Sequence, residues 1–464
     1  MQTHQRVSFA DFIRLHEGDD PVRLLLSRDK LRDQYPDLDI DLAVTTLEVR
    51  RKLKNKVPEW YSVPSLIYPF RLSGEQCSST ETARYKASLM ARLIGEGVLP
   101  ETCGHPRPNH PKNRQIFGGP ETQPFEGPAA CGGRGRSEAE AVSGRIPSPI
   151  NIADLTGGMG VDVWAFSQVA EEVFYNEMQE ELVKATELNF RELGVKNVRF
   201  SCRKVEVGKV KEVLDGFEPD VIFLDPARRA EDGRKVFLIE ECQPDVVGLL
   251  PELFGVSRFV MLKLSPMADI TMACKRLAHV KEVHVVASGG ECKELLFVLD
   301  REWDGPCSIF AVEGGAVMEI PDQVGNDGFE IRFEVPKEGG ILFEPGKALA
   351  KAGAFNLPCG QFGMTKLGIH THLYAGETVP EGLKPFGKWF EILSVQPLNN
   401  RSMKEAGKRY PQAEVTARNI PMTSDLLRKK MGCGSGGEVH IFGVRMDGGA
   451  DAGNYLVITK RMDK

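Results

Sequence analysis

The segment from residue 150 to residue 162 constrains the fold of this chain more than any other stretch. A short apolar run ends at Asp154, and a helical pattern begins at Val161. The turn between them holds a threonine and three glycines, Thr156, Gly157, Gly158 and Gly160. Glycine accepts left-handed dihedrals and lets a ligand approach the main chain, and the first amides of the next helix then face that ligand. The pattern predicts a nucleotide-sized site at the carboxyl edge of an α/β sheet.

Two later strand ends support the same prediction. Glu177 follows a second apolar run, Val173 to Tyr175, and the sequence from Asp225 to Arg229 follows a third, Val221 to Leu224. In an open parallel sheet the carboxyl ends of neighbouring strands meet at one edge. We therefore expect these residues to converge around one ligand.

The chain before the glycine turn divides into two segments that differ in composition and apolar periodicity. Residues 1–100 carry apolar residues at helical spacing, which predicts a helical amino-terminal domain. Residues 101–149 contain eight glycines and eight prolines and lack apolar periodicity. Such a composition does not build a packed core, so we expect a flexible insertion.

The remainder alternates strands and helices before it turns to a mixed pattern. Residues 150–303 predict seven strands of a Rossmann-like α/β sheet, in which the last two pair antiparallel because only a short turn, Ser288 to Glu291, joins them. A helix is expected around Phe237 to Leu250. Residues 304–380 contain short β pieces, and residues 381–464 end in a βαββ pattern.

The composition of the chain limits the cellular environments and the binding partners that we expect. The net charge of −6 gives no global attraction to nucleic acid. Residues 330–464, however, contain 19 Lys and Arg against 14 Asp and Glu, which is consistent either with a polyanion-facing module or with an evenly solvated surface. The ten cysteines form no CxxC pair, and no apolar run is long enough for a membrane helix. We expect a cytoplasmic protein without a metal site, a membrane contact or a DNA partner.

The glycine turn fits one cofactor better than another. A dinucleotide site needs GxGxxG, but Val163 occupies the position of the last glycine. S-adenosyl-L-methionine needs a turn open to its methionyl group, an acid for its ammonium and an acid for its ribose. Asp154 and Glu177 supply the two acids, and Met178 would lie against the adenine. Asp162 either touches the cofactor or stabilises the start of its helix.

Several motifs together resemble one protein family. They are Tyr68-Pro69, Gln76 to Ser79, Ala83 to Lys86, Asp154 to Asp162, Leu224 to Arg229, Lys263 to Met267, Gly289 to Glu294, Phe343 to Pro345, Lys351 to Asn356, Thr371 to Tyr374 and Ala417 to Asn419. The chain resembles the class I S-adenosylmethionine-dependent methyltransferases and, more closely, the bacterial members with a THUMP-like carboxyl-terminal domain. The resemblance implies a class I catalytic domain over 150–303, a small ferredoxin-like domain over 304–380 and a THUMP-like RNA-binding domain over 381–464.

The resemblance also implies an activity. THUMP-type modules present structured RNA to a catalytic domain, so it implies methylation of a base in RNA, either tRNA or rRNA. The helix before the glycine turn is also similar to the corresponding segment of trimethylguanosine synthases, which methylate an exocyclic guanine nitrogen.

This chain departs from its relatives at two places. The tract from Cys103 to Pro149 interrupts the usual passage into the first strand. The end of the third strand, Ser201 to Arg203, lacks the acid that holds the adenine amino group, and Glu206 is the candidate substitute.

Four residues are candidates for catalysis. Asp225 and Pro226 keep part of the Asp-Pro-Pro-aromatic motif of amino-directed enzymes, while Arg228 replaces its aromatic residue. Lys263 ends the fifth strand and is a phosphate contact, a proton acceptor with a lowered pKa, or a lysine that only reaches solvent. No cysteine stands beside it, which disfavours a carbon-5 pyrimidine mechanism.

The substrate candidates are polar or basic, and each also has a purely structural interpretation. They are Ser79, Tyr85, Lys86, Arg229, Ser265 and Arg418. Two other functions stay open: a small-molecule methyltransferase, and a catalytically weak RNA-binding or assembly factor that retains the fold.

Overall fold

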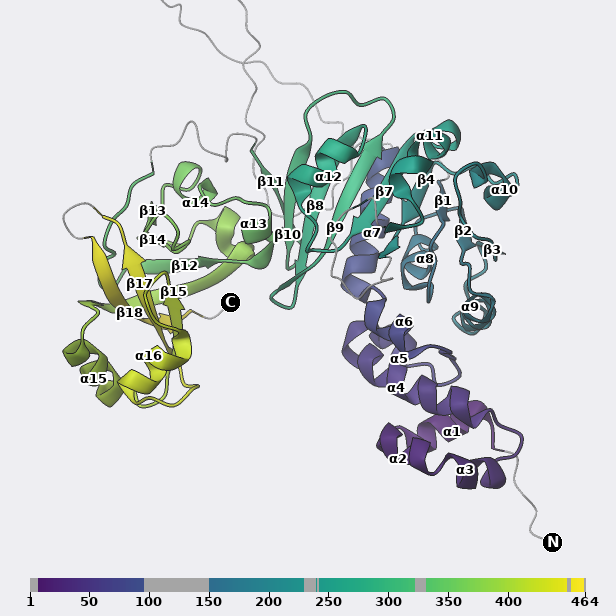
Figure 1. Cartoon of the computed structure of the whole chain (residues 1–464), viewed down its shortest axis with the longest axis horizontal. Helices are drawn as coiled ribbons and strands as arrows, with labels where there is room; N and C mark the ends of the chain where they lie inside the picture. Colours follow the sequence, from purple (N-terminus) through teal and green to yellow (C-terminus); the bar gives the residue numbers. More distant parts are fainter. Residues whose placement is uncertain are drawn as a thin grey trace, which may run out of the picture.

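The computed structural model describes residues 7–95, 150–228, 239, 242–321, 331–448 and 452–462. The expected insertion at 101–149 lies outside the described residues, as does Arg229. Figure 1 shows three parts: amino-terminal helices, a first sheet, and a second sheet beside it.

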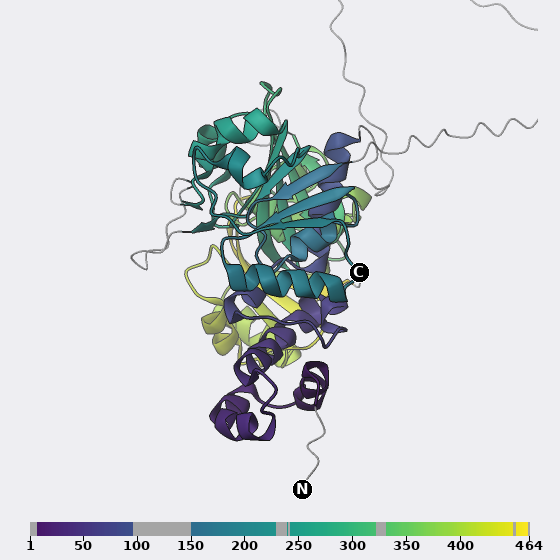
Figure 2. The ribbon, with the colours of Figure 1, turned by 90° about the vertical axis from the view of Figure 1, so that its right-hand side faces the viewer.

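The amino-terminal part is helical, as the sequence predicts. Its helices are α1 (Phe9–His16), α2 (Pro21–Leu26), α3 (Arg28–Gln34), α4 (Ile40–Lys56), α5 (Pro58–Tyr61), α6 (Arg71–Gln76) and α7 (Thr80–Ile94). Ser79 begins α7 with a capping box: its hydroxyl accepts from the Thr82 amide, and the Thr82 hydroxyl accepts from the Ser79 amide. The helices α1 to α3 lie away from both sheets. Side chains of α4 and α5 join the buried cluster of the first sheet, and α7 runs along that sheet and packs on α8 (Figures 1 and 2).

The first sheet has nine strands in the order β11-β10-β8-β9-β7-β4-β1-β2-β3. Its strands are β1 (Asn151–Asp154), β2 (Glu172–Asn176), β3 (Val198–Ser201), β4 (Val221–Leu224), β7 (Phe259–Leu264), β8 (Val280–Ser288), β9 (Glu291–Asp300), β10 (Ser308–Glu313) and β11 (Ala316–Ile320). The expected seven strands are all present, and β9 runs antiparallel between β7 and β8. The sheet continues past residue 303, where we expected it to end, because β10 pairs parallel with β8.

Helices cover this sheet on both faces. They are α8 (Val161–Phe166), α9 (Glu180–Glu192), α10 (Val210–Leu214), α11 (Val246–Val256) and α12 (Ile270–Arg276). The central strand β4 is buried along its whole length, which explains its continuous apolar sequence. The helix expected around Phe237 to Leu250 begins later, at Val246. Residues Cys242–Gln243 form β6, which pairs with β5 (Ala227–Arg228), and Asp245 caps α11.

The second sheet has seven strands in the order β13-β14-β12-β15-β18-β17-β16. They are β12 (Ile341–Pro345), β13 (Thr365–Lys366), β14 (Tyr374–Gly376), β15 (Gly387–Pro397), β16 (Glu414–Arg418), β17 (Val439–Met446) and β18 (Gly453–Arg461). Its helical segments are α13 (Lys347–Lys351), α14 (Leu357–Gly360), η3 (Glu381–Phe386), α15 (Asn400–Arg409) and α16 (Ser424–Met431). The expected βαββ ending is formed by β16, α16, β17 and β18.

One apolar core joins the two sheets. Leu349 of α13 and Phe343 of β12 belong to the same buried cluster as Val283 and Phe297 of the first sheet. Within the described ranges, no helix has the length and apolar content to cross a bilayer.

Candidate cofactor and active site

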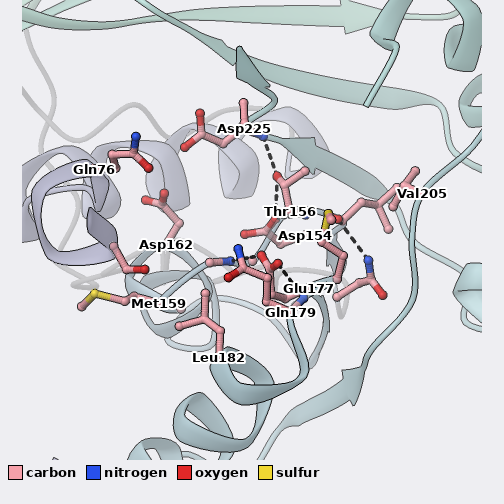
Figure 3. Close-up of a pocket in the computed structure, with 18 of the residues that line it drawn as sticks. Gln76, Asp154, Thr156, Met159, Asp162, Glu177, Gln179, Leu182, Val205 and Asp225 are labelled. Carbon is pink, nitrogen blue, oxygen red and sulfur yellow. Dashed lines mark hydrogen bonds between the residues drawn. The ribbon is translucent and has the colours of Figure 1, made fainter. Parts of the chain in front are cut away.

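A cleft opens at the carboxyl ends of β1, β2 and β4, where the sequence predicts the ligand (Figure 3). The glycine turn forms one wall. Helix α6 adds Ser73 and Gln76 to the lining, and the link from α6 to α7 adds Cys77 and Ser78. The amino-terminal domain therefore completes a site whose other walls come from the sheet.

The glycine turn is closely packed from beneath by Tyr175. The Tyr175 hydroxyl donates to the Gly158 carbonyl at 2.6 Å. A Cβ on Gly157 would lie 2.2 Å from a carbon of that ring, and Gly160 has a φ of +85°, with Thr186 2.7 Å from its ideal Cβ. Side chains at these two positions would displace the turn, so glycine is required there.

Asp154 ties the turn to the neighbouring strand. Its carboxylate is 1% exposed and accepts from the Thr156 amide at 2.8 Å. The Thr156 hydroxyl in turn accepts from the Asp225 amide at 2.6 Å. Burial raises the pKa of Asp154 well above its usual value, and nearby Asp162 and Asp225 add to this rise. Asp154 therefore holds the shape of the cleft besides lining it.

Glu177 and Met178 stand at the end of β2 on the open side of the cleft. The Glu177 carboxylate accepts from the amides of Gly158 at 3.2 Å and Gln179 at 3.0 Å, which fixes its orientation. Met178 is 57% exposed and lines the cleft beside it. The half-buried carboxylate of Glu177 could accept hydrogen bonds from a ribose. The exposed thioether of Met178 could pack against the face of a base.

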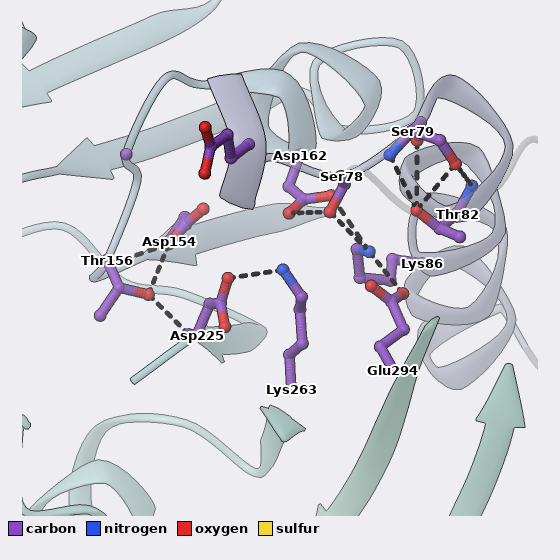
Figure 4. A network of polar contacts seen from close by, with 12 residues as sticks. Ser78, Ser79, Thr82, Lys86, Asp154, Thr156, Asp162, Asp225, Lys263 and Glu294 are labelled. Atoms are coloured by element: carbon purple, nitrogen blue, oxygen red, sulfur yellow. Dashed lines mark hydrogen bonds and ion pairs between the residues drawn. The ribbon is translucent and has the colours of Figure 1, made fainter. Parts of the chain in front are cut away.

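A buried polar network lies behind the cleft, where α7 meets the sheet (Figure 4). The Lys86 ammonium is fully buried, 2.6 Å from Glu294 and 3.2 Å from Asp162. Ser78 donates to Asp162 at 2.8 Å. Although Asp162 Oδ1 forms the ion pair with Lys86, it is buried and accepts no hydrogen bond from the described residues. Lys86 thus contacts two buried carboxylates directly, one of which lines the cleft.

Lys263 of β7 lies beside Asp225, which follows the neighbouring strand β4, and its ammonium is 2.6 Å from the carboxylate. Burial lowers the pKa of Lys263, but the carboxylates of Asp225, Asp162 and Glu294 outweigh this and leave it above the usual value. The interpretation of Lys263 as a proton acceptor with a lowered pKa is therefore wrong. Lys263 remains a cation that orients Asp225.

The structure separates most of the substrate candidates from the cleft. Tyr85 bonds to His284 at 2.7 Å, Lys86 is enclosed, and Ser79 caps α7. Ser265 accepts from the Met267 amide at 3.2 Å, in a turn after β7. Arg418 lies on the second sheet, 2.6 Å from Glu344. None of these five side chains lines the cleft.

Three further candidates have distinct outcomes. Glu206 is exposed and held 2.7 Å from both Lys204 and Lys209, so it does not occupy the position expected of an adenine ligand. Pro226 is buried between two lining residues, Asp225 and Ala227. Arg228 lies on β5, and its side chain is outside the described part of the structure.

Sequence reasoning missed several lining residues, namely Ser73, Gln76, Cys77, Gln243 and Pro244. Gln76 and Cys77 belong to a motif that carries the family resemblance, and this was the only signal for them. Gln243 and Pro244 come from the β5–β6 ribbon, which no periodicity indicated. Among the described residues, no three His, Cys, Asp or Glu side chains gather as metal ligands.

Comparisons with known proteins agree with this architecture. A model described as a ferredoxin-like domain matches residues 342–382, and one described as THUMP domain-like matches residues 387–461. The crystal structure of a candidate methyltransferase from Porphyromonas gingivalis W83 has a TM-score of 0.73 and 26% identity, with 100% of both chains covered.

A shorter match concerns a curated protein. An RNA methyltransferase of Enterococcus faecalis, itself named as uncharacterized, is 33% identical over 94 residues. These residues are 20% of this chain and 21% of that protein, so the chain spans about a fifth of the curated relative that it matches.

Proposed function

We propose that this chain, a methyltransferase-like protein with a THUMP-like carboxyl-terminal domain, is an S-adenosylmethionine-dependent RNA methyltransferase. One observation carries the proposal: a glycine turn, two acids and an exposed methionine converge on one cleft at the carboxyl edge of the sheet. That arrangement supports a nucleoside-bearing cofactor with a positively charged end.

The residues present fit S-adenosylmethionine. The glycine turn leaves main chain open to the methionyl part, Glu177 would hold the ribose, and Met178 would lie against the adenine. Asp154 and Asp162 line the same cleft and would face the cationic end of the ligand. When bound, the cofactor supplies a methyl group on a sulfonium.

The acceptor side favours an amino group of a base in structured RNA, either tRNA or rRNA. Asp225 is an acceptor at the end of β4, and the Lys263 ammonium fixes one of its oxygens at 2.6 Å. Its other oxygen can accept a hydrogen bond from an exocyclic NH₂ and so align the nitrogen. Pro226 stiffens the main chain directly after it.

The second sheet supports RNA as the substrate. Helices α15 and α16 pack together, and four of their lysines are exposed without an ion pair to any described residue: Lys404, Lys408, Lys429 and Lys430. Arg418 is a further proposed contact, with its side chain 40% exposed. Such cations bind backbone phosphates and make affinity fall with salt.

Calorimetry tests the cofactor part. Glu177→Ala should weaken S-adenosylmethionine binding about tenfold or more, because the charge-assisted hydrogen bonds to the ribose are lost. Glu171 is an exposed acid just before β2, at the other end of the strand from Glu177. The variant Glu171→Ala is the matched control and should bind the cofactor as the wild type does. Equal affinity in both variants would remove the cofactor assignment.

Tritiated methyl transfer tests the reaction. RNA from a strain lacking the gene should accept label from the wild-type protein, and Asp225→Asn should lower the rate by roughly a hundredfold. Label entering small metabolites and not RNA would indicate a small-molecule methyltransferase. Salt-sensitive RNA binding without any transfer would indicate a binding factor.

A further inference from the structure

The helical domain contains a second cavity, separate from the cofactor cleft. Its lining residues are Glu17, Leu47, Arg50, Arg51, Lys54 and Tyr61. Three of these side chains are cations and one is an anion, so the cavity carries a net positive charge. The cofactor cleft uses none of them.

Arg50 supplies a buried charge to this cavity. Its side chain is 3% exposed, and its terminal nitrogens donate to the carbonyls of Val63 at 3.0 Å and Tyr61 at 2.7 Å. One nitrogen also donates to Glu17 at 3.1 Å, while Nε is buried without a partner among the described residues. Arginine cannot lose its proton, and Glu17 is 40% exposed and therefore screened by water. The charge of Arg50 is thus only partly compensated.

Arg51 and Lys54 are exposed beside it on the same helix. Arg51 donates to the carbonyl of Asp19, and neither residue forms an ion pair with a described carboxylate. The Tyr61 ring lies 4.8 Å from the Arg50 guanidinium carbon and 5.9 Å from the Lys54 ammonium, which holds both cations against one wall.

The other two lysines in the last turns of α4 have partners on α6. Lys52 pairs with Glu75, and Lys56 donates to the Glu75 carbonyl at 2.7 Å. Arg50 and Lys54 are four residues apart, and like charges at that spacing destabilise a helix. The positive charge of this part of α4 that Glu17 does not balance therefore lies at the cavity, where a further anion would relieve the repulsion.

We propose that this cavity binds a backbone phosphate of the RNA substrate. The assignment rests on the proposed RNA methyltransferase function. Helix α4 packs on α6, and α6 contributes Ser73 and Gln76 to the cofactor cleft, so RNA that reaches the cleft passes close to this domain. Arg51 and Lys54 donate to the phosphate oxygens, and Arg50 adds its charge from below.

The test compares two lysines of one helix in the full-length protein. Lys54→Gln removes a cation from the cavity, and Lys52→Gln removes one that faces Glu75 instead. Binding of unfractionated bacterial tRNA is measured by filter retention over a range of salt. We expect Lys54→Gln to weaken binding roughly threefold to tenfold and to reduce the slope of log affinity against log salt by about 0.7–0.9, the loss of one phosphate contact. Lys52→Gln should change affinity less than about twofold, and both variants should keep the wild-type melting temperature.

The outcomes separate this inference from the proposed function. Equal affinities for the two variants, with wild-type methyl transfer intact, overturn the cavity assignment and leave the methyltransferase standing. A wild-type protein that binds no RNA overturns both. A parallel titration with inorganic phosphate, followed by phosphorus NMR, covers the other source of the same chemistry. If Lys54→Gln abolishes phosphate binding but leaves tRNA affinity unchanged, the cavity serves a free phosphate compound and the assignment to RNA is wrong.

Discussion

Several residues of the cleft hold its main chain in place through close packing and hydrogen bonds. Gly157 has no side chain because Tyr175 fills the space beneath it, and Tyr175 in turn fixes the Gly158 carbonyl. Asp154 and Thr156 link β1 to the main chain of Asp225. The proposed cofactor binding and the proposed alignment of the acceptor would therefore depend on the same few contacts.

Gly157→Ala tests the closeness of this packing. The added Cβ would meet the Tyr175 ring at 2.2 Å, so either the ring or the turn must move. We expect a loss of about 1–3 kcal/mol in the free energy of unfolding and a roughly tenfold or greater loss of cofactor affinity by calorimetry. Gly255→Ala in α11, where nothing lies within 4 Å of the new Cβ, should keep the wild-type cofactor affinity and raise the free energy of unfolding by at most about 1 kcal/mol, because alanine favours a helix over glycine. A Gly157→Ala protein with unchanged cofactor affinity would contradict the proposed role of the turn.

At the scale of elements, α7 is the helix on which the cleft depends. It brings Lys86 to Asp162 at the start of α8 and to Glu294 on β9, and it brings Tyr85 and Arg92 to a second polar cluster on β8. An amphipathic pattern predicts the helix, but it does not reveal that a lysine lies on the buried face. Both clusters fix the position of α7 more specifically than apolar packing would, because each buried charged group needs its own partner.

Lys86→Met should be strongly destabilising. The substitution leaves Glu294 and Asp162 buried without their cation, which costs about 3–5 kcal/mol in the free energy of unfolding measured with urea. The double variant Lys86→Met with Glu294→Met removes one of the orphaned charges and should recover more than half of that loss. If the double variant is no more stable than Lys86→Met alone, the pair does not act as the structure indicates.

The second cluster predicts a pH dependence. Glu282 is buried, which by itself raises its pKa, but hydrogen bonds from His284 and Arg92 outweigh this and lower the pKa to about 2. A carboxyl group with a lowered pKa in the folded state contributes stability at higher pH, and that contribution is lost as the pH falls from about 4.5 to about 2. The loss is on the order of 2 kcal/mol.

Glu282→Gln should therefore flatten the acid limb of a stability curve measured by urea unfolding between these pH values. Glu171→Gln, at an exposed position, is the control and should keep the wild-type slope. An acid limb as steep in Glu282→Gln as in the wild type would show that another group carries the dependence.

At the scale of the whole molecule, the two sheets share one core. Helix α13 packs on β8, β9 and β10 while β12 belongs to the second sheet, so apolar side chains from both sheets form a single buried cluster. A second cluster, around α15 and α16, belongs to the second sheet alone. The first sheet and the ferredoxin-like segment should therefore not unfold independently.

Leu349→Ala and Leu427→Ala make this testable by hydrogen exchange. Both leucines are nearly or fully buried, at 1% and 0% exposure, and each truncation should cost about 2–5 kcal/mol. Leu349→Ala should raise exchange in β8 to β10 and in β12 together, whereas Leu427→Ala should raise it around α15 and α16. Exchange confined to one sheet in Leu349→Ala would contradict a shared core.

The amino-acid sequence alone determined the α/β sheet, the antiparallel pairing of β8 with β9 and the residues at the carboxyl edge of the sheet. These features are local: a strand, a turn and a helix start lie within a dozen positions, and apolar periodicity marks the strands that carry Glu177 and Asp225. It also indicated the βαββ ending, for the same reason.

Only the tertiary structure decided which polar side chains face the cleft. Lys86 meets Glu294 at a separation of 208 residues, and no periodicity encodes such a partner. The same holds for the parallel pairing of β10 with β8 and for the glutamine and proline that the β5–β6 ribbon brings to the cleft. Side-chain burial and pKa depend on contacts between distant segments, so they exist only once the chain has folded.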